Sequence, residues 1–375
     1  MCANNMWRPM LVCSDNMCNG CMACVEKCSV SAITIEDGID AYNAVINQKI
    51  CTGCRQCMKV CPNNSSPIKH SPIMWKQGWA KNEEVRSCSS SGGLAAALSY
   101  SFVKTGGIVC SCVFRNGEFV FDFVSDAADV AKFSGSKYVK SNPKGVYKKI
   151  CEYLKNDTKV LFIGLPCQVA GVKSFIGEHD LLYTVDLICH GTPSPRLLEM
   201  FLNEYGYTPA LLNSITFRNK GNWYLSCDEK KVTPVSVMDK YMFAFLKSVD
   251  YTENCYSCRY ASVDRISDIT IGDSWGSELS DVEKKKGISI VLCQSEKGKR
   301  LLENSDLALF DVNTEITIEN NKQLLKPSVK TAEREVFFTC LENRNSFKIA
   351  FSKAYPKIAF RLWLKELLVK SGILK

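Results

Sequence analysis

Beyond about Trp75 the hydrophobic and polar positions alternate between a pattern typical of strands and a pattern typical of helices. Apolar runs at 159–165, 181–188, 268–271 and 288–293 predict buried strands, and 94–103, the segment from Pro195 and 298–303 predict helices. Two further runs, 108–114 and 118–124, flank Asn116-Gly117 and predict a hairpin. The pattern therefore predicts an α/β domain with a mixed sheet in this part of the chain.

The N-terminal part contains an internal repeat of cysteines instead. The same spacing of four cysteines occurs twice, 33 residues apart, in the sets Cys18, Cys21, Cys24, Cys28 and Cys51, Cys54, Cys57, Cys61. In this spacing three thiolates on one tight loop hold three corners of a [4Fe-4S] cube, and the fourth cysteine reaches the other cube. We therefore expect one cluster on Cys18, Cys21, Cys24 and Cys61, and a second on Cys51, Cys54, Cys57 and Cys28. Zinc held by four thiolates is the alternative.

Length and composition indicate more than a small electron carrier. The chain has 375 residues, of which 46% are hydrophobic, enough for two or three domains and one sizeable core. We predict an α+β protein with a ferredoxin-type two-cluster module at 1–70, a larger α/β domain at 71–330 and a helical basic tail at 331–375. The chain has no apolar run of about 18 residues and no signal-peptide pattern, so we expect a cytoplasmic protein. That location also suits cysteines that must stay reduced.

The positive charge of the chain is concentrated near its end. The net charge is +8, and residues 347–375 carry seven Lys or Arg against the single acid Glu366. This distribution argues against a nucleic-acid partner. After Pro356, basic residues recur every four positions opposite an apolar arc, which predicts a basic amphipathic helix. This helix either packs on its own domain or contacts a membrane surface or a partner protein.

Two small-residue segments are candidates for binding phosphate. Ser89-Ser90-Ser91-Gly92-Gly93 directly precedes the helix predicted at 94–103, where free backbone N–H groups gather at a positive helix end. The alternative is an ordinary serine-rich helix cap. Gly135-Ser136-Lys137-Tyr138 adds an ammonium and an aromatic ring that suit a pyrophosphate or a flavin edge, and its alternative is a plain loop. ATP and conventional NAD sites are unsupported, because neither glycine-rich motif is present.

Four more cysteines have the positions of ligands. Cys255 and Cys258 have the two-residue gap of a metal-binding knuckle, and Cys167 and Cys189 each follow a predicted strand, where neighbouring strands bring them together. They predict a third cluster, with structural zinc or a redox-active cysteine pair as alternatives. His190, next to Cys189, is interpreted as a residue beside the cluster or a flavin.

Taken together, these motifs resemble the coenzyme F-420 hydrogenase/dehydrogenase beta-subunit family, in the form with an N-terminal two-cluster ferredoxin domain. The resemblance runs from Cys18 to about Ser277 and includes Gly164 to Gln168, Ile188 to Gly191 and Gly272 to Gly276. It implies an FAD beside a [4Fe-4S] cluster held by Cys167, Cys189, Cys255 and Cys258. The residues predicted to contact FAD are Ser90, Ser91, Gly92, Gly93, Ser136, Lys137, Tyr138, Gln168, His190, Asp273 and Trp275.

The predicted function is an iron-sulfur flavoprotein oxidoreductase. Electrons are expected to pass between two ferredoxin-type clusters, a third cluster and FAD, and on to a deazaflavin coenzyme or another two-electron small molecule. Ferredoxin or a deazaflavin is the expected redox partner, and no residues are assigned to catalysis. The alternatives are an electron-transfer subunit that feeds a partner enzyme and a zinc-binding scaffold without catalysis. The sequence determines neither the substrate, the direction of electron flow nor the oligomeric state.

Overall fold

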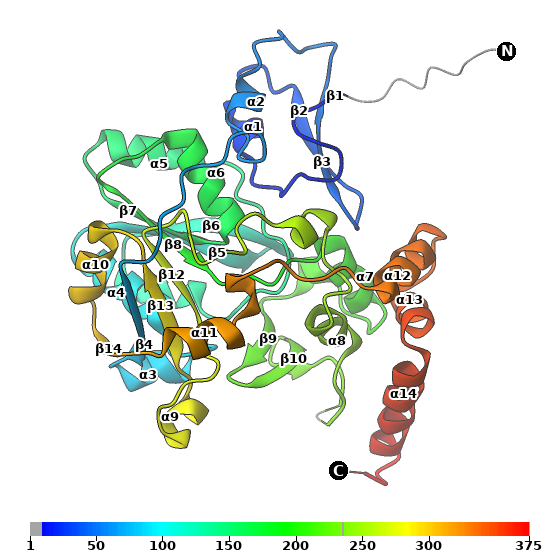
Figure 1. The fold of residues 1–375 in the computed structure, drawn as a ribbon. Coiled ribbons are helices and arrows are strands. Elements are labelled where there is room, and N and C mark those ends of the chain that lie inside the picture. Colours follow the sequence, from blue (N-terminus) through cyan, green and yellow to red (C-terminus); the bar gives the residue numbers. More distant parts are fainter. Residues whose placement is uncertain (1–9, 235, 375) are drawn as a thin grey trace, which may run out of the picture.

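The computed structural model describes residues 10–234 and 236–374 of the chain (Figure 1). Residues 1–9, which belong to the predicted first domain, lie outside the described residues. A small N-terminal unit sits at one end of the molecule, and a larger unit built on one long sheet forms the body. This arrangement confirms the predicted α+β class with a mixed sheet.

The N-terminal unit combines a small sheet with two short helices. Its antiparallel strands have the order β1 (Met10–Leu11), β3 (Tyr42–Ile46) and β2 (Ile33–Asp37), and its helices are α1 (Ala23–Lys27) and α2 (Gln56–Lys59). Cys24 lies in α1 and Cys57 in α2, so each copy of the cysteine repeat runs from a loop into a helical turn. α1 contacts α2 on one side and α5 and α6 of the larger unit on the other.

The larger unit is organised around an eight-stranded sheet with parallel strands at its centre. The strand order is β14 (Leu307–Phe310), β4 (Met74–Ala80), β13 (Ser289–Cys293), β12 (Ile269–Asp273), β8 (Leu182–Leu187), β7 (Val160–Gly164), β5 (Ile108–Arg115) and β6 (Glu118–Val124). β12, β8, β7 and β5 are parallel, whereas β13, β4, β14 and β6 pair antiparallel with their neighbours. The predicted hairpin at Asn116-Gly117 is confirmed, with both residues at positive φ.

Alternate residues of the central strands face two different layers. Val160 and Phe162 of β7 belong to a core shared with the N-terminal unit, whereas Leu161 and Ile163 face α4 and α10. The helices of the chain are α3 (Glu83–Ser87), α4 (Leu94–Lys104), α5 (Val146–Lys155), α6 (Pro166–Ile176), α7 (Pro195–Asn203), α8 (Lys240–Leu246), α9 (Asp281–Lys286), α10 (Glu296–Glu303), α11 (Thr314–Asn320), α12 (Ala332–Glu342), α13 (Phe347–Ala354) and α14 (Pro356–Lys370). Short 3-10 helices are η1 (Ala127–Phe133), η2 (Pro209–Leu211), η3 (Glu253–Ser257) and η4 (Lys322–Leu324).

A second small sheet and the C-terminal helices complete the fold. The strands β9 (Ile215–Asn219), β10 (Asn222–Cys227) and β11 (Lys230–Lys231) form an antiparallel sheet that the sequence pattern did not predict. α14, the predicted basic helix, extends away from the body, and of its side chains only Ala359 is buried (Figure 1). Among the helices of the described chain, none is long and apolar enough to cross a membrane.

Candidate iron-sulfur and cofactor sites

The loops that carry the eight N-terminal cysteines turn backbone N–H groups toward sulfur. The N–H groups of Gly20 and Gly53 each donate to the first cysteine of their copy, Cys18 and Cys51, at 3.4 Å. Both glycines have φ near +70°, a conformation that residues with a Cβ rarely adopt. Cys28 accepts a similar bond from Ala32 N at 3.2 Å. Such N–H to sulfur bonds raise the reduction potential of clusters that lie in them, and they suit thiolate ligands better than neutral thiols.

The structure brings the fourth cysteine of each copy to the opposite loop. Burial, with the neighbouring Cys61 as the next cause, raises the pKa of Cys24 to about 12. Burial also raises the pKa of Cys57, and the nearby Cys28 and Cys51 add to the rise. Cys61 therefore lies with the first loop and Cys28 with the second, as the crossed ligand pattern requires.

The first cysteine loop is fixed directly to the larger unit. The buried carboxylate of Glu26 accepts hydrogen bonds from the N–H groups of Gly145 at 2.8 Å and Lys148 at 3.1 Å, at the N-terminus of α5. The Tyr147 hydroxyl donates to the carbonyl oxygen of Cys21. A Cβ placed on Gly171 of α6 would lie 2.9 Å from the Cβ of Cys21, so the helix backbone touches this loop. Contact this close holds the first loop against α6.

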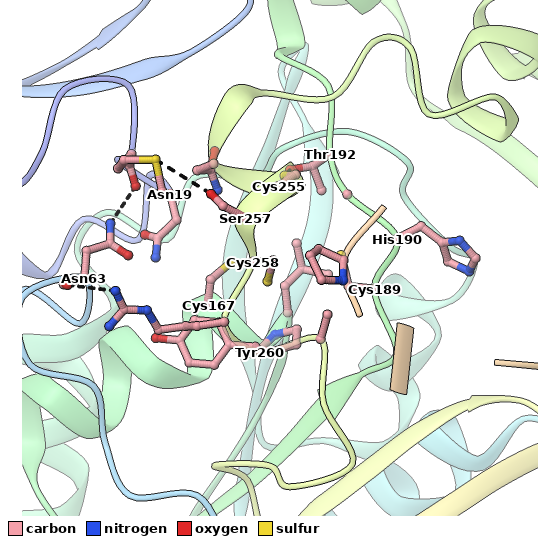
Figure 2. Close-up of a pocket in the computed structure, with 18 of the residues that line it drawn as sticks. Asn19, Asn63, Cys167, Cys189, His190, Thr192, Cys255, Ser257, Cys258 and Tyr260 are labelled. Carbon is pink, nitrogen blue, oxygen red and sulfur yellow. Dashed lines mark hydrogen bonds between the residues drawn. The ribbon is translucent and has the colours of Figure 1, made fainter. Parts of the chain in front are cut away.

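The four additional cysteines surround a common space beside that contact. Cys167 lies in the first turn of α6, Cys189 follows β8, and Cys255 and Cys258 come from η3 and its end. Figure 2 shows their sulfur atoms directed toward one another, and all four line a cavity of about 120 Å³. Among residues 10–234 and 236–374, no group of three or more His, Cys, Asp or Glu side chains converges as the ligands of a single metal ion would.

Lys140, a lysine that the sequence did not identify, is one of the cations that line this cavity, together with Arg259 and Arg265. Burial raises the pKa of Cys167 to about 12, and the ammonium of Lys140 opposes that rise. Lys140 is itself buried and lines the cavity, with its Nζ 3.4 Å from the carbonyl oxygen of Asn19. A cation at this place stabilises thiolates, which are the form that binds iron.

A second and larger cavity of about 270 Å³ collects most of the residues predicted to contact FAD. Its lining includes Ser90, Ser91, Gly93, Ser136, Lys137, Tyr138, Gln168, His190 and Asp273. The N-terminus of α4 has no side-chain cap, and Gly93, Ala95 and Ala96 of this terminus line the cavity. Uncapped N–H groups at the end of an eleven-residue helix are a suitable site for phosphate. The residues therefore fit a phosphate-bearing cofactor.

Several of the predicted contacts have other partners in the structure. Gly92 packs between strands: its N–H donates to Ser289 Oγ at 2.9 Å, and a Cβ on it would lie 2.4 Å from the Gly78 carbonyl oxygen. Trp275 does not line the cavity and is 41% exposed. The Lys137 ammonium donates to the carbonyl oxygens of Phe133 at 2.7 Å and Ser134 at 2.9 Å. Gly92 thus serves strand packing and Lys137 holds its own loop, whereas Trp275 lies outside the cavity.

Arg218 is a cavity residue that the sequence did not identify. It comes from β9, and its guanidinium holds the carboxylate of Asp273 through two hydrogen bonds of 2.6 and 2.9 Å. The same guanidinium lies 3.4 Å from the Tyr138 hydroxyl. These bonds fix Asp273 and Tyr138 on the cavity wall. No motif marks Arg218, because its partners lie far away in the sequence.

The two cavities are neighbours. Both are lined by Leu165 and by the segment from Cys189 to Thr192. The cysteine-lined cavity and the cavity with the uncapped helix end therefore share a wall formed by Leu165 and the segment from Cys189 to Thr192. His190 points away from the four sulfur atoms, as Figure 2 shows.

Two parts of the chain match models of known protein families. Residues 17–65 match the model of the 4Fe-4S dicluster domain, and residues 157–312 match the model of the C terminus of the coenzyme F420 hydrogenase/dehydrogenase beta subunit. A chain of the F420-reducing [NiFe] hydrogenase complex from Methanosarcina barkeri aligns with 70% of this chain and 97% of its own length, at 16% identity and a TM-score of 0.45. No curated protein matches the chain.

The fold and the cysteine pattern thus define an iron-sulfur protein with a two-cluster domain at its N-terminus. Within its larger unit, residues 157–312 match the C-terminal domain of the coenzyme F420 hydrogenase/dehydrogenase beta subunit, the family that the sequence motifs resemble. This relationship connects the chain to subunits of redox enzymes.

Proposed function

We propose that the chain is a cytoplasmic iron-sulfur flavoprotein oxidoreductase that exchanges electrons between three [4Fe-4S] clusters, FAD and a two-electron small-molecule substrate. The proposal keeps the division at residues 70 and 330 into cluster module, catalytic domain and tail. Its main support is the shared wall of the two cavities. This wall brings four cysteines, of which Cys255 is buried and the other three are partly buried, next to a site suited to a phosphate-bearing cofactor.

Each part of the chain has a defined task in this proposal. Cys18, Cys21, Cys24 and Cys61 would hold the first cluster, Cys51, Cys54, Cys57 and Cys28 the second, and Cys167, Cys189, Cys255 and Cys258 the third. The uncapped end of α4 would bind the FAD phosphates, with Ser90 and Ser136 beside them. FAD would supply the coupling between two-electron and one-electron transfer that clusters alone lack.

The protein's own groups set the surroundings of these cofactors. The ion pair of Arg218 and Asp273 fixes the wall of the larger cavity, and its apolar side chains, such as Phe121 and Ile271, exclude water. Gln168 is held by the Ser141 hydroxyl at 2.9 Å and accepts from Leu165 N at 2.9 Å, which orders the turn between the cavities. The deazaflavin substrate remains one candidate among small two-electron acceptors.

Anaerobic purification with iron, sulfide and flavin analysis tests the proposal. We expect about twelve iron and twelve sulfide per chain, as three cubes require, together with one FAD. The double variant Cys189→Ala, Cys255→Ala should lose about four iron, as one cube contains. Cys340→Ser, which lies on α12 away from both cavities, is the matched control. Zinc in place of iron, or a loaded chain without flavin, would refute the proposal.

A second candidate is an electron-transfer subunit without its own substrate, which feeds a partner enzyme. α14 supports it because Phe360, Trp363, Leu364 and Leu367 form an exposed apolar stripe, with Phe360 62% exposed. Lys357, Arg361 and Lys365 border the stripe. Truncation after Pro356 should then abolish co-purification of a partner subunit but leave the iron and flavin content of the chain unchanged. If the truncation abolishes binding to lipid vesicles instead, α14 contacts a membrane. If neither partner binding nor vesicle binding changes, α14 has no docking role.

A further inference from the structure

We propose that the second cysteine loop, residues 47–59, is the surface at which an acidic one-electron carrier protein docks. This inference rests on the proposed iron-sulfur function and adds the place and chemistry of the redox partner. It starts from a difference between the two copies of the cysteine repeat. Cys18, Cys21 and Cys24 of the first copy are buried, whereas Cys54 of the second is exposed and Cys51 and Cys57 are only partly buried.

The exposure of the second loop has a simple architectural cause. α1 is covered by α5 and α6 and contacts α2 on its other side, so α2 and its loop lie on the outer side of the module (Figure 1). The residues from Asn47 to Ile50 and from Thr52 to Gln56 are all exposed. A cluster held here would be the one that an external protein can approach most closely.

The charge of this loop is of one sign. Lys49, Arg55 and Lys59 are exposed, and the segment 47–60 contains no Asp or Glu. None of the three cations forms an ion pair within the described part of the chain. Each is at most two residues from a cysteine of the loop, so their charges lie close to the cluster position.

The first copy provides an internal comparison. The residues that correspond to Lys49, Arg55 and Lys59 at the repeat distance of 33 are Asn16, Met22 and Glu26. Glu26 is buried against the N-terminus of α5, where its carboxylate serves the contact between the units. The cations are therefore not needed for the cysteine fold itself, since the first copy forms the same turn without them. They are specific to the copy that faces solvent.

The surface also has the composition of a transient docking site. Ile50, between Lys49 and Cys51, is 48% exposed and supplies an apolar centre within the basic border. Electron-transfer partners bind through small interfaces, and opposite charges steer their encounter. A small acidic carrier protein, such as a ferredoxin, has the complementary charge.

Rapid-mixing reduction of the complete, cluster-loaded protein tests this surface. The probe is reduced plant-type [2Fe-2S] ferredoxin, an acidic protein, and the small cation methyl viologen radical serves as a second reductant. The variant Lys49→Gln, Arg55→Gln, Lys59→Gln should slow reduction by ferredoxin by about tenfold or more at low salt, as loss of electrostatic steering predicts. Reduction by methyl viologen should not slow. In the unmodified protein, the ferredoxin rate should fall steeply as salt is added.

The matched control changes the same number of charges at the other end of the molecule. Lys284→Gln, Lys285→Gln, Lys286→Gln alters exposed lysines of α9, which lies opposite the module in Figure 1. It should leave the ferredoxin rate unchanged. An equal loss in this control, an unchanged rate in the loop variant, or a salt-independent rate in the unmodified protein would overturn the docking site. Iron and sulfide analysis separates failure of the docking site from failure of the proposed function. A cluster-loaded chain with unchanged ferredoxin rates would refute only the docking site, whereas a chain without clusters would refute both proposals.

Discussion

Replacing Gly171 with alanine tests the contact between α6 and the first cysteine loop, because two effects of opposite sign meet at this position. In the interior of a helix, alanine is more stable than glycine by about 0.5–1 kcal/mol. The new Cβ, however, would lie 2.7 Å from the Tyr147 hydroxyl and 2.9 Å from the Cβ of Cys21. Both neighbours are buried, and the Cys21 Cβ belongs to the loop itself.

The steric effect should be the larger one. Ordinary contact begins near 3.4 Å, so the loop or the helix must move by about half an ångström, and overpacking of this kind costs about 1–3 kcal/mol. We expect Gly171→Ala to lower the free energy of unfolding by up to about 2.5 kcal/mol after the gain in helix propensity is subtracted. If the proposed first and third clusters are bound, the displacement should also weaken their magnetic coupling, because Cys167 lies one helical turn from Gly171.

Chemical denaturation of the variant, with electron paramagnetic resonance of the reduced protein, measures both effects. Gly221→Ala is the control, since a Cβ there meets nothing within 4 Å and its φ is not in the left-handed region. It should change neither the unfolding free energy nor the spectrum appreciably. A Gly171→Ala protein that is more stable than the unmodified chain, with unchanged cluster signals, would refute the proposed close contact.

Three further predictions concern other parts of the structure. Glu26→Gln should lower the free energy of unfolding by about 1.5–3 kcal/mol, because a charged acceptor at the N-terminus of α5 is lost. Urea denaturation measures this change, and an unchanged midpoint would contradict the prediction. If the proposed FAD site at α4 is present, Ala95→Asp in the first turn of that helix should weaken FAD binding at least about tenfold by repelling phosphate, while adding about 0.3–1 kcal/mol to helix stability. Flavin titration of this variant beside Ala95→Asn measures the effect, and equal affinities of the two variants would contradict the prediction. Burial raises the pKa of Asp239 from 3.8 to about 6 in the folded protein. Because the folded protein binds this proton more tightly than the unfolded chain, the folded protein becomes more stable as pH falls through 6 and less stable as pH rises. The unfolding free energy of the unmodified chain minus that of Asp239→Asn should therefore increase by up to about 3 kcal/mol between pH 7 and pH 4, and a difference that is independent of pH would be the contrary result.

The parts of the site that follow buried strands were predictable from the sequence. β7 and β8 appear as apolar runs, and because they are neighbouring parallel strands, Cys167 and Cys189 meet at the same edge of the sheet. The cysteine repeat likewise carries its own geometry in its spacing. In both cases the information is local or depends on a regular element.

Other parts depend on contacts between distant segments, for which the sequence has no periodic signal. Arg218 reaches Asp273 across 55 residues, and Gly171 touches a cysteine loop 150 residues earlier. The apolar run at 288–293 predicted a strand, but its antiparallel direction in β13 does not follow from hydrophobicity. Lys137 has the residue type of a phosphate ligand, but in the structure its ammonium donates to carbonyl oxygens of its own loop. Such choices are settled by tertiary packing.

The internal repeat shows how one pattern acquires two roles. Both copies carry the same ligand spacing and the same glycine at positive φ, so the sequence alone gives no order to the two clusters. The order comes from what each copy touches: the first lies on α6 near Cys167, and the second lies at the surface among cations. In the proposed function, electrons pass most readily between neighbouring centres, so the surface copy would form the outer end of the series of clusters and the buried copy would lie between it and the Cys167 site. The clearest difference between the two copies is at one equivalent position, where the first copy has the buried Glu26 and the second has the exposed Lys59.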